Sequence, residues 1–176
     1  GSLVMYELRD AIGEENVNRA LAKFVKEHAF EQPPYTNSAA LVKEFRAVAP
    51  ADKQQLITDL FENIVLYDNK TTTAESTKLA NGQYRIKITV TSKKFRSDAG
   101  GNEKEVPLDD WIDVGVLGDG GKLKTKDDKV LAMEKHRITK PEMTFEFTVK
   151  EKPTRAGIDP LNKLIDRNPD DNTKKL

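Results

Sequence analysis

The stretch YRIKITVT at residues 84–91 alternates strictly between apolar and polar side chains, with isoleucine at positions 86 and 88. A period of two residues is typical of a β-strand that buries one face and exposes the other. The dipeptide Asn81-Gly82 stands directly before this stretch and favours a tight hairpin turn. The sequence therefore predicts an antiparallel hairpin, with the partner strand within residues 71–79.

The same alternation continues beyond this hairpin. Three further runs are candidate strands, at residues 112–116, 130–138 and 143–149. Glycine-rich segments at residues 100–102 and 118–121 predict turns between them. About seven short strands with such spacing predict an antiparallel β-sandwich, immunoglobulin-like in outline, over residues 67–152. Trp111 is the candidate aromatic residue of its core.

The first part of the chain follows a helical period instead. Apolar residues recur at steps of three and four, which is the pattern of a helix with one buried face. The four predicted helices cover residues 3–12, 14–29, 38–48 and 52–64. Gly13 ends the first helix, and Pro33-Pro34 interrupts the chain after the second. We therefore predict an α+β fold, with a helical segment at residues 1–66 before the sandwich.

Residues 153–176 are polar and contain several prolines. Asp and Asn beside proline favour local turns, in which the side chain bonds to nearby backbone. This composition predicts a C-terminal tail that is partly ordered at best. The apolar residues Leu161, Leu164 and Ile165 would attach it to the sandwich.

Composition excludes several classes of protein. Hydrophobic residues make up 37% of the 176 residues and charged residues 33%, which predicts a thin core. The 29 basic and 29 acidic residues cancel, so a global basic field for nucleic acid is absent and no nucleic-acid partner is expected. Cysteine is absent, which excludes disulfides and thiolate chemistry.

The sequence also bears on membranes and leader segments. It contains no apolar run near the ~18 residues that a membrane span needs, so we expect the chain itself to be soluble. The first residues lack a basic region followed by an apolar stretch, which is the pattern of a signal peptide.

Metal-binding patterns are weak. His28 and His136 are the two histidines, and neither belongs to an H-E-x-x-H pattern. A set of aspartates could supply oxygen ligands for calcium, but its spacing does not match an EF-hand loop, and we interpret it as solvated loops. The set comprises Asp109, Asp110, Asp113, Asp119, Asp127 and Asp128. We therefore predict no catalytic, cofactor-binding or metal-ligating residue in this chain.

Two further patterns favour structural roles. Residues 118–122 read GDGGK, but no helix-forming sequence follows the lysine, so they predict a hairpin loop and not a phosphate loop. A basic set could form a patch for anionic lipid or nucleic acid, but we interpret it as solvated lysines that discourage edge pairing. This set comprises Lys93, Lys94, Arg96, Lys122, Lys124, Lys126 and Lys129.

Both ends of the chain resemble one family. Residues 1–21, GSLVMYELRDAIGEENVNRAL, resemble the segment K-G-x-x-v-x-x-x-L-x-x-x-i-G-e-x-x-f-x-x-a-L, which follows the catalytic helices of aminopeptidase N-type zinc metallopeptidases, the gluzincins. Ile158-Asp159-Pro160 and residues 164–172 resemble the extreme C-terminus of a bacterial subset of this family. In that subset the peptidase is fused behind a multi-spanning, ABC-permease-like membrane region.

The resemblance implies a non-catalytic role for this chain. The family's H-E-x-x-H, its downstream glutamate ligand and its transition-state tyrosine all precede the matched opening segment, and this chain lacks them. Neither Tyr6 nor Tyr35 lies in the context of that tyrosine. The chain would be the C-terminal portion of a membrane-associated zinc aminopeptidase, with zinc and peptide substrates bound by an upstream catalytic domain.

Two expectations about partners follow. The helical segment, with Val17, Leu21 and Phe24 on its apolar face, would pack partly against the upstream catalytic domain, or would self-associate in its absence. The alternative is a stand-alone, immunoglobulin-like binding or adhesion module without enzymatic activity.

Overall fold

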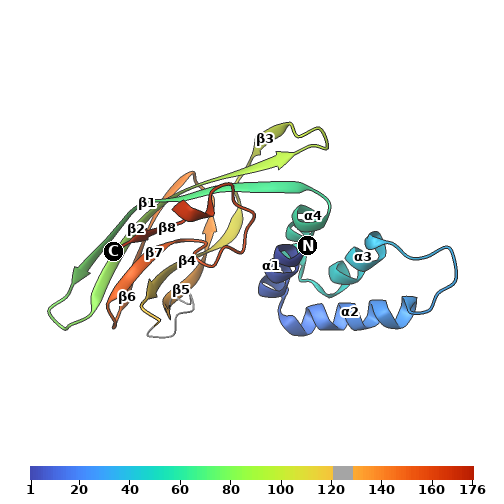
Figure 1. The fold of residues 1–176 in the computed structure, drawn as a ribbon, viewed down its shortest axis with the longest axis horizontal. Helices are drawn as coiled ribbons and strands as arrows, with labels where there is room; N and C mark the ends of the chain where they lie inside the picture. Colours follow the sequence, from blue (N-terminus) through green and yellow to red (C-terminus); the bar gives the residue numbers. More distant parts are fainter. Residues whose placement is uncertain (121–128) are drawn as a thin grey trace. The chain divides into compact units, whose positions relative to one another are not determined.

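The computed structural model describes residues 1–120 and 129–176 (Figure 1). The chain forms two compact units. The helical unit comprises residues 1–65 together with 97–102, and the sandwich unit comprises residues 66–96 together with 103–176.

Four α-helices in the described residues confirm the helical period. They are α1 (Ser2–Ile12), α2 (Glu14–His28), α3 (Ser38–Val48) and α4 (Gln54–Phe61), with a 3-10 turn η1 (Ala51–Lys53) before α4. Gly13 joins α1 to α2 with a φ of 86°, a conformation that favours glycine. The Asn37 side chain caps α3 by accepting a hydrogen bond from the Ala39 amide at 3.0 Å. The fourth helix is shorter than predicted, because Ile64 begins the first strand.

The helical unit has a small apolar core of its own. Its buried members are Leu8, Ile12, Val17, Ala20, Phe45 and Ile57. The Phe45 ring stacks on Phe61 with centroids 5.5 Å apart. Val17 is therefore buried by its own unit, so the expectation that it awaits a partner is wrong, whereas Phe24 is half-buried.

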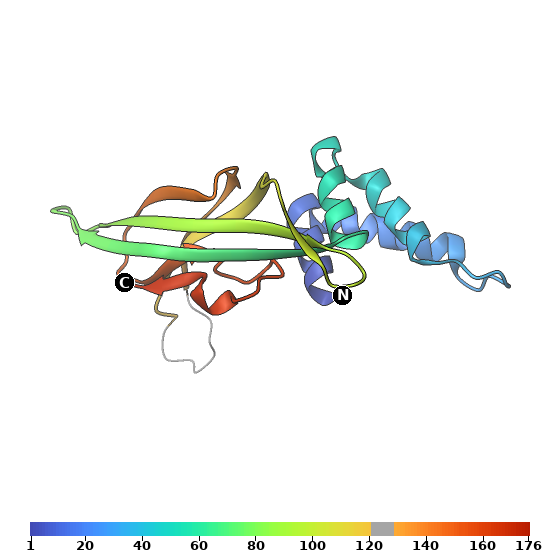
Figure 2. The ribbon, with the colours of Figure 1, turned by 90° about the horizontal axis from the view of Figure 1, so that it is seen from above.

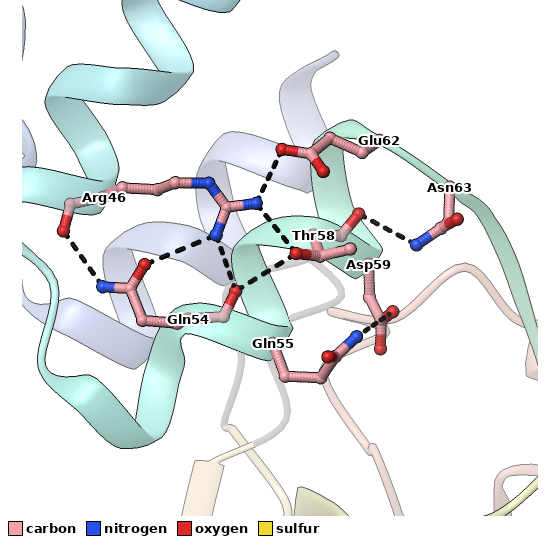
Figure 3. A network of polar contacts seen from close by, with 7 residues as sticks. All are labelled: Arg46, Gln54, Gln55, Thr58, Asp59, Glu62 and Asn63. Atoms are coloured by element: carbon pink, nitrogen blue, oxygen red, sulfur yellow. Dashed lines mark hydrogen bonds and ion pairs between the residues drawn. The ribbon is translucent and has the colours of Figure 1, made fainter.

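A polar network joins α3 to α4 (Figure 3). The Arg46 guanidinium donates hydrogen bonds to Thr58 Oγ1 at 2.8 Å and to Glu62 Oε1 at 2.6 Å. The Gln54 amide donates to the Arg46 carbonyl at 3.0 Å. One arginine thus binds side chains along the whole of α4, and so holds the two short helices together.

Eight strands in the described residues form two antiparallel sheets. They are β1 (Ile64–Lys78), β2 (Tyr84–Ser97), β3 (Glu103–Val106), β4 (Asp110–Gly118), β5 (Lys129–Ile138), β6 (Glu142–Val149), β7 (Pro153–Ile158) and β8 (Thr173–Lys175). In one sheet β2 pairs with β1, β3 and β6, and the other has the order β5-β4-β7-β8. Figure 2 shows β1 and β2 side by side as the longest strands. The predicted α+β fold with an antiparallel sandwich is confirmed.

The quoted stretch 84–91 lies on β2 and forms much of the sandwich core. Ile86 and Ile88 are fully buried, and Ile86 lies opposite Phe147 of β6. Ile112, Val114 and Val116 of β4 are buried in the second sheet. The turn at Asn81-Gly82 also forms as predicted, with Gly82 at a φ of 84°.

Trp111 is not a core residue, contrary to our expectation. Its side chain is 52% exposed. Successive residues of a strand point to opposite faces, so the burial of Ile112 and Val114 turns Trp111 to the other face of β4. There it lies opposite Arg137 of β5.

Residues 153–176 form part of the sandwich, so the predicted tail is wrong. β7 pairs with β4, and β8 pairs with β7. A 3-10 turn η2 (Pro169–Asp171) precedes β8. Of the three apolar residues expected to attach it, Leu161 and Ile165 are exposed, whereas Leu164 is half-buried. Backbone pairing attaches the segment, together with the fully buried side chains of Ala156 and Ile158 on β7 and with buried polar side chains.

Candidate functional site

The interior of the sandwich changes from apolar to polar along its two longest strands. On β2 the buried positions pass from Ile86, Ile88 and Val90 to Ser92 and Lys94. On β1 the buried positions after Val65 are Tyr67, Asn69 and Thr71. We call the polar part, which consists of Tyr67, Asn69, Thr71, Ser92, Lys94 and Asp110, the polar seam. Buried polar groups are the usual starting point in a search for a site.

One end of the polar seam is an ion pair between the buried Lys94 and the partly buried Asp110. Lys94 Nζ donates to Asp110 Oδ1 at 2.8 Å, and the Tyr67 hydroxyl donates to the same oxygen at 2.9 Å. The Lys94 ammonium also lies 5.7 Å from the centre of the Tyr67 ring. The positive charge of Lys94 and the hydrogen bond from Tyr67 therefore offset the cost of removing the Asp110 carboxylate from water.

The middle of the seam binds the segment after β7. Ser92 Oγ donates to the side-chain oxygen Oδ1 of Asn69 at 2.5 Å. The backbone N–H of Asn69 donates to Asp166 Oδ2 at 2.9 Å. Tyr67 exchanges backbone hydrogen bonds with Ile165 at 2.9 Å and with Arg167 at 3.0 Å. Burial raises the pKa of Asp166 above its ordinary value, although two backbone amides oppose this shift. Residues 165–167 thus run parallel to the start of β1.

A second polar cluster, which we call the charged fastener, consists of Asp113, Lys135, Asp159 and Lys163. Lys163 Nζ lies 2.6 Å from Asp113 Oδ2, and Lys135 Nζ lies 3.3 Å from Asp113 Oδ1. Asp159 bonds through its backbone amide to the Asp113 carbonyl at 2.7 Å. Its carboxylate accepts the backbone amides of Lys163 at 2.9 Å and Leu164 at 3.0 Å. The fastener therefore folds residues 159–164 into a turn and fixes that turn to β4.

Asp159 makes the stability of the chain depend on pH. Burial raises the pKa of the Asp159 carboxyl to about 6, and the Asp113 charge adds to this effect. The folded state then binds the proton more tightly than the unfolded state, whose pKa is close to 3.8. The associated stability is present in full below pH 3.8 and is lost as the pH rises through 6. The shift corresponds to about 3 kcal/mol.

We expect this loss to disappear in Asp159→Asn, which has no charge to titrate. The free energy of unfolding is measured in urea for the wild type and the variant. The measurement is repeated from about pH 3.5 to about pH 7.5 in steps of roughly half a unit. The wild type should lose stability relative to the variant across this range. Parallel curves for the two proteins would show that Asp159 is not responsible.

The chemistry of the two clusters is structural. Each buried carboxylate accepts hydrogen bonds from a lysine or from backbone amides, and each buried lysine in them has a carboxylate partner. Among residues 1–120 and 129–176, no three histidine or acidic side chains gather as metal ligands. The described geometry thus holds the segment after β7 on the sandwich, and it presents no assembled catalytic set.

The predicted acidic set is dispersed. Asp109 forms a bidentate ion pair with Arg137 at 2.5 and 2.8 Å, which lowers the pKa of the Asp109 carboxyl. Asp110 and Asp113 bind different lysines, as described above, and Asp119 follows the end of β4. The interpretation as solvated loops is wrong for Asp110 and Asp113, since both lie on β4, Asp110 is partly buried and Asp113 is buried. Asp127 and Asp128 lie outside the described residues.

The other candidates are equally separate. His28 Nδ1 lies 2.8 Å from Glu31, whereas the His136 ring lies 4.4 Å from the ring of Phe145. The interpretation of the basic set as solvated lysines holds for Lys93, which is exposed, and is wrong for Lys94, which is buried. In the glycine-rich loop, Gly118 ends β4. Gly121 and the lysines at positions 122, 124 and 126 lie outside the described residues.

Sequence reasoning missed the residues that build both clusters. Asn69 and Thr71 follow the period of two residues on β1, but they are polar, so a search for apolar alternation does not find them. The Asp159-Pro160 turn was visible as a turn, but its contact with Asp113 was not. The sequence does contain a usable signal, because alternate positions of a strand share one face. Those positions are Val65, Tyr67, Asn69 and Thr71, and the burial of the first two predicts the burial of the others.

Comparisons with known proteins do not identify the chain. No family model matches it, and no curated protein matches it. In the part of the chain that the structure describes, no helix has the length and the apolar character needed to cross a membrane.

Proposed function

We propose that this chain is the non-catalytic C-terminal portion of a membrane-associated zinc aminopeptidase. Its helical unit would complete the wall of the peptidase domain, and its sandwich would be an accessory domain. One observation carries the proposal, namely where the residues that resemble the family lie in the structure.

These residues form the core and the turn of the helical unit. Leu8, Ile12 and Ala20 match apolar positions of the family pattern, and all three are buried. Gly13 matches its glycine and adopts a positive φ between α1 and α2. Val17 stands where the pattern has an aromatic residue, and it is buried in the same core. The pattern thus has a physical meaning as a helix-turn-helix unit, which supports the resemblance.

The surface of the helical unit also supports a role in completing a larger domain. Val25 on α2 is 59% exposed, and Leu3 and Tyr6 lie on one side of α1 with large exposed areas. In the loop after α2, Phe30 is entirely exposed, and so is most of Tyr35. Exposed apolar side chains of this size favour burial against another protein surface.

The zinc chemistry would belong to the upstream region. In this family the metal polarises the scissile carbonyl and activates water. The residues described here do not fit a zinc site, since His28 and His136 belong to different units and each has other neighbours. No step of the reaction is therefore assigned to a residue of this chain.

The proposal is tested by expressing the catalytic region of the same gene as a separate polypeptide with the 176-residue chain. We expect the two polypeptides to copurify. Val25→Asp should weaken their association at least about tenfold, because it places a charge in an apolar contact. Val25 is exposed, so the variant should fold normally.

Val130→Asp is the matched control. Val130 is 45% exposed on β5 of the sandwich unit, and this substitution should leave the association unchanged. Absence of a complex, or equal weakening by both variants, would contradict the proposal. An isolated chain that neither binds the catalytic region nor needs it would be a stand-alone binding module.

A further inference from the structure

Two asparagine side chains inside the sandwich lack protein partners for their amide groups. Asn69 and Asn172 are both 0% exposed. Asn69 Oδ1 accepts the Ser92 hydroxyl, but Asn69 Nδ2 has no hydrogen-bond partner within the described ranges 1–120 and 129–176. In the same ranges, neither Nδ2 nor Oδ1 of Asn172 has one. Exchanging the nitrogen and oxygen of Asn172 would not change this, because both atoms are unpaired.

Asn69 and the backbone of Asn172 belong to one neighbourhood. Thr71 Oγ1 donates to the Asn172 carbonyl at 2.6 Å and accepts the Ile158 amide at 3.3 Å. Asn69 is two residues before Thr71 and points to the same side of β1, so their Cα atoms are about 7 Å apart. Gly157, which has no side chain, also lies beside Thr71 and Asn172. Thr71 Oγ1 and the Asn172 carbonyl supply polar atoms here, and Gly157 adds no side chain.

Burial of unpaired amide groups is unfavourable, because each group loses its hydrogen bonds to bulk water. The three unpaired atoms comprise two N–H donor groups and one carbonyl acceptor. A ligand that pairs with them must both accept and donate hydrogen bonds. It must also be very small, since neither side chain reaches the surface. Water meets each of these requirements, and buried water typically makes about three hydrogen bonds.

We propose that the polar seam binds an internal water molecule between β1 and the segment before β8. The water accepts a hydrogen bond from an Nδ2 group of Asn69 or Asn172 and donates one to Asn172 Oδ1. It would connect Asn172 to the sandwich through hydrogen bonds that the protein does not make directly. This bound water would be an integral part of the contact that holds the C-terminal segment.

Asn172→Leu tests the proposal by the sign of its effect. If water is bound, the variant removes its hydrogen bonds and leaves Asn69 Nδ2 unpaired, so the melting temperature should fall by roughly 2–4 °C or more. If the site is dry, replacing two unpaired polar atoms with an apolar group of similar size should raise the melting temperature. Asn168→Leu, at an exposed position of the same segment, is the control and should change little.

The second measurement uses the wild-type chain, because a variant can also lose stability through poor packing. Nuclear Overhauser contacts between water and the side-chain amide protons of Asn69 or Asn172, with the sign expected of a long-lived bound water, are the expected result. Their absence from fully assigned amide signals, or a rise in melting temperature for Asn172→Leu, would overturn the proposal.

Discussion

Replacing Gly157 with alanine is expected to lower the free energy of unfolding by about 3 kcal/mol or more. An added Cβ would lie 2.0 Å from the Asn172 carbonyl oxygen and 2.5 Å from Thr71 Oγ1. It would also lie 2.8 Å from the Thr173 Cα. Two of these atoms are backbone atoms, which cannot rotate away as a flexible side chain can. The C-terminal segment would have to move away from β1 and β7.

Chemical denaturation of the wild type and Gly157→Ala measures this effect. Gly100→Ala is the matched control, since its Cβ would come no closer than 3.3 Å and would meet only side chains. The control should cost less than about 1 kcal/mol. Equal stability of the wild type and Gly157→Ala would show that the C-terminal segment does not pack on β1 as described.

Lys163→Met should also be destabilising, by about 2–3 kcal/mol. Methionine retains an apolar side chain of similar length but has no charge. Asp113 would keep its ion pair with the half-exposed Lys135, but it would lose the closer lysine at 2.6 Å while remaining buried. A buried carboxylate with reduced compensation is much more costly than an exposed one.

Two further variants separate this effect from a general loss of packing. In an Asp113→Asn background, Lys163→Met should cost much less, because the buried carboxylate charge is gone. Lys129→Met removes an ion pair with Glu151 in which both side chains are half-exposed, and it should cost at most about 1 kcal/mol. Similar losses for Lys163→Met in both backgrounds would contradict the role assigned to the fastener.

The sequence was most informative where one physical signal dominates. On β2 the apolar positions 86, 88 and 90 alternate with polar ones, and burial of one face follows directly from that alternation. On α2 the residues Val17 and Leu21 follow the helical period, and both pack in the helical core. Such patterns are local, so the four helices and most strands could be predicted without knowledge of their partners.

The C-terminal segment could not be predicted in this way. β7 contains few large apolar residues, and its place in the sheet depends on pairing with β4, about forty residues earlier in the chain. Lys163 is charged and reads as solvent-exposed, yet it is buried because Asp113 lies opposite it. A single sequence does not reveal that two charged residues fifty positions apart will be buried together.

The exposed position of Trp111 has a similar cause. Tryptophan in a strand favours burial, but the phase of β4 is set by the buried positions 112, 114 and 116. Once those residues face the core, Trp111 must face the other side. Further along that side of β4, Asp113 and Gly115 are buried, so Trp111 is exposed because it also lies at the beginning of the strand.

The central claim, that this chain completes a zinc aminopeptidase, is tested most directly by determining the reading frame of its gene upstream of residue 1. The account predicts an open frame that continues upstream through an H-E-x-x-H motif and a downstream glutamate ligand. A frame that begins at Met5, with no such motif before it, would contradict the account.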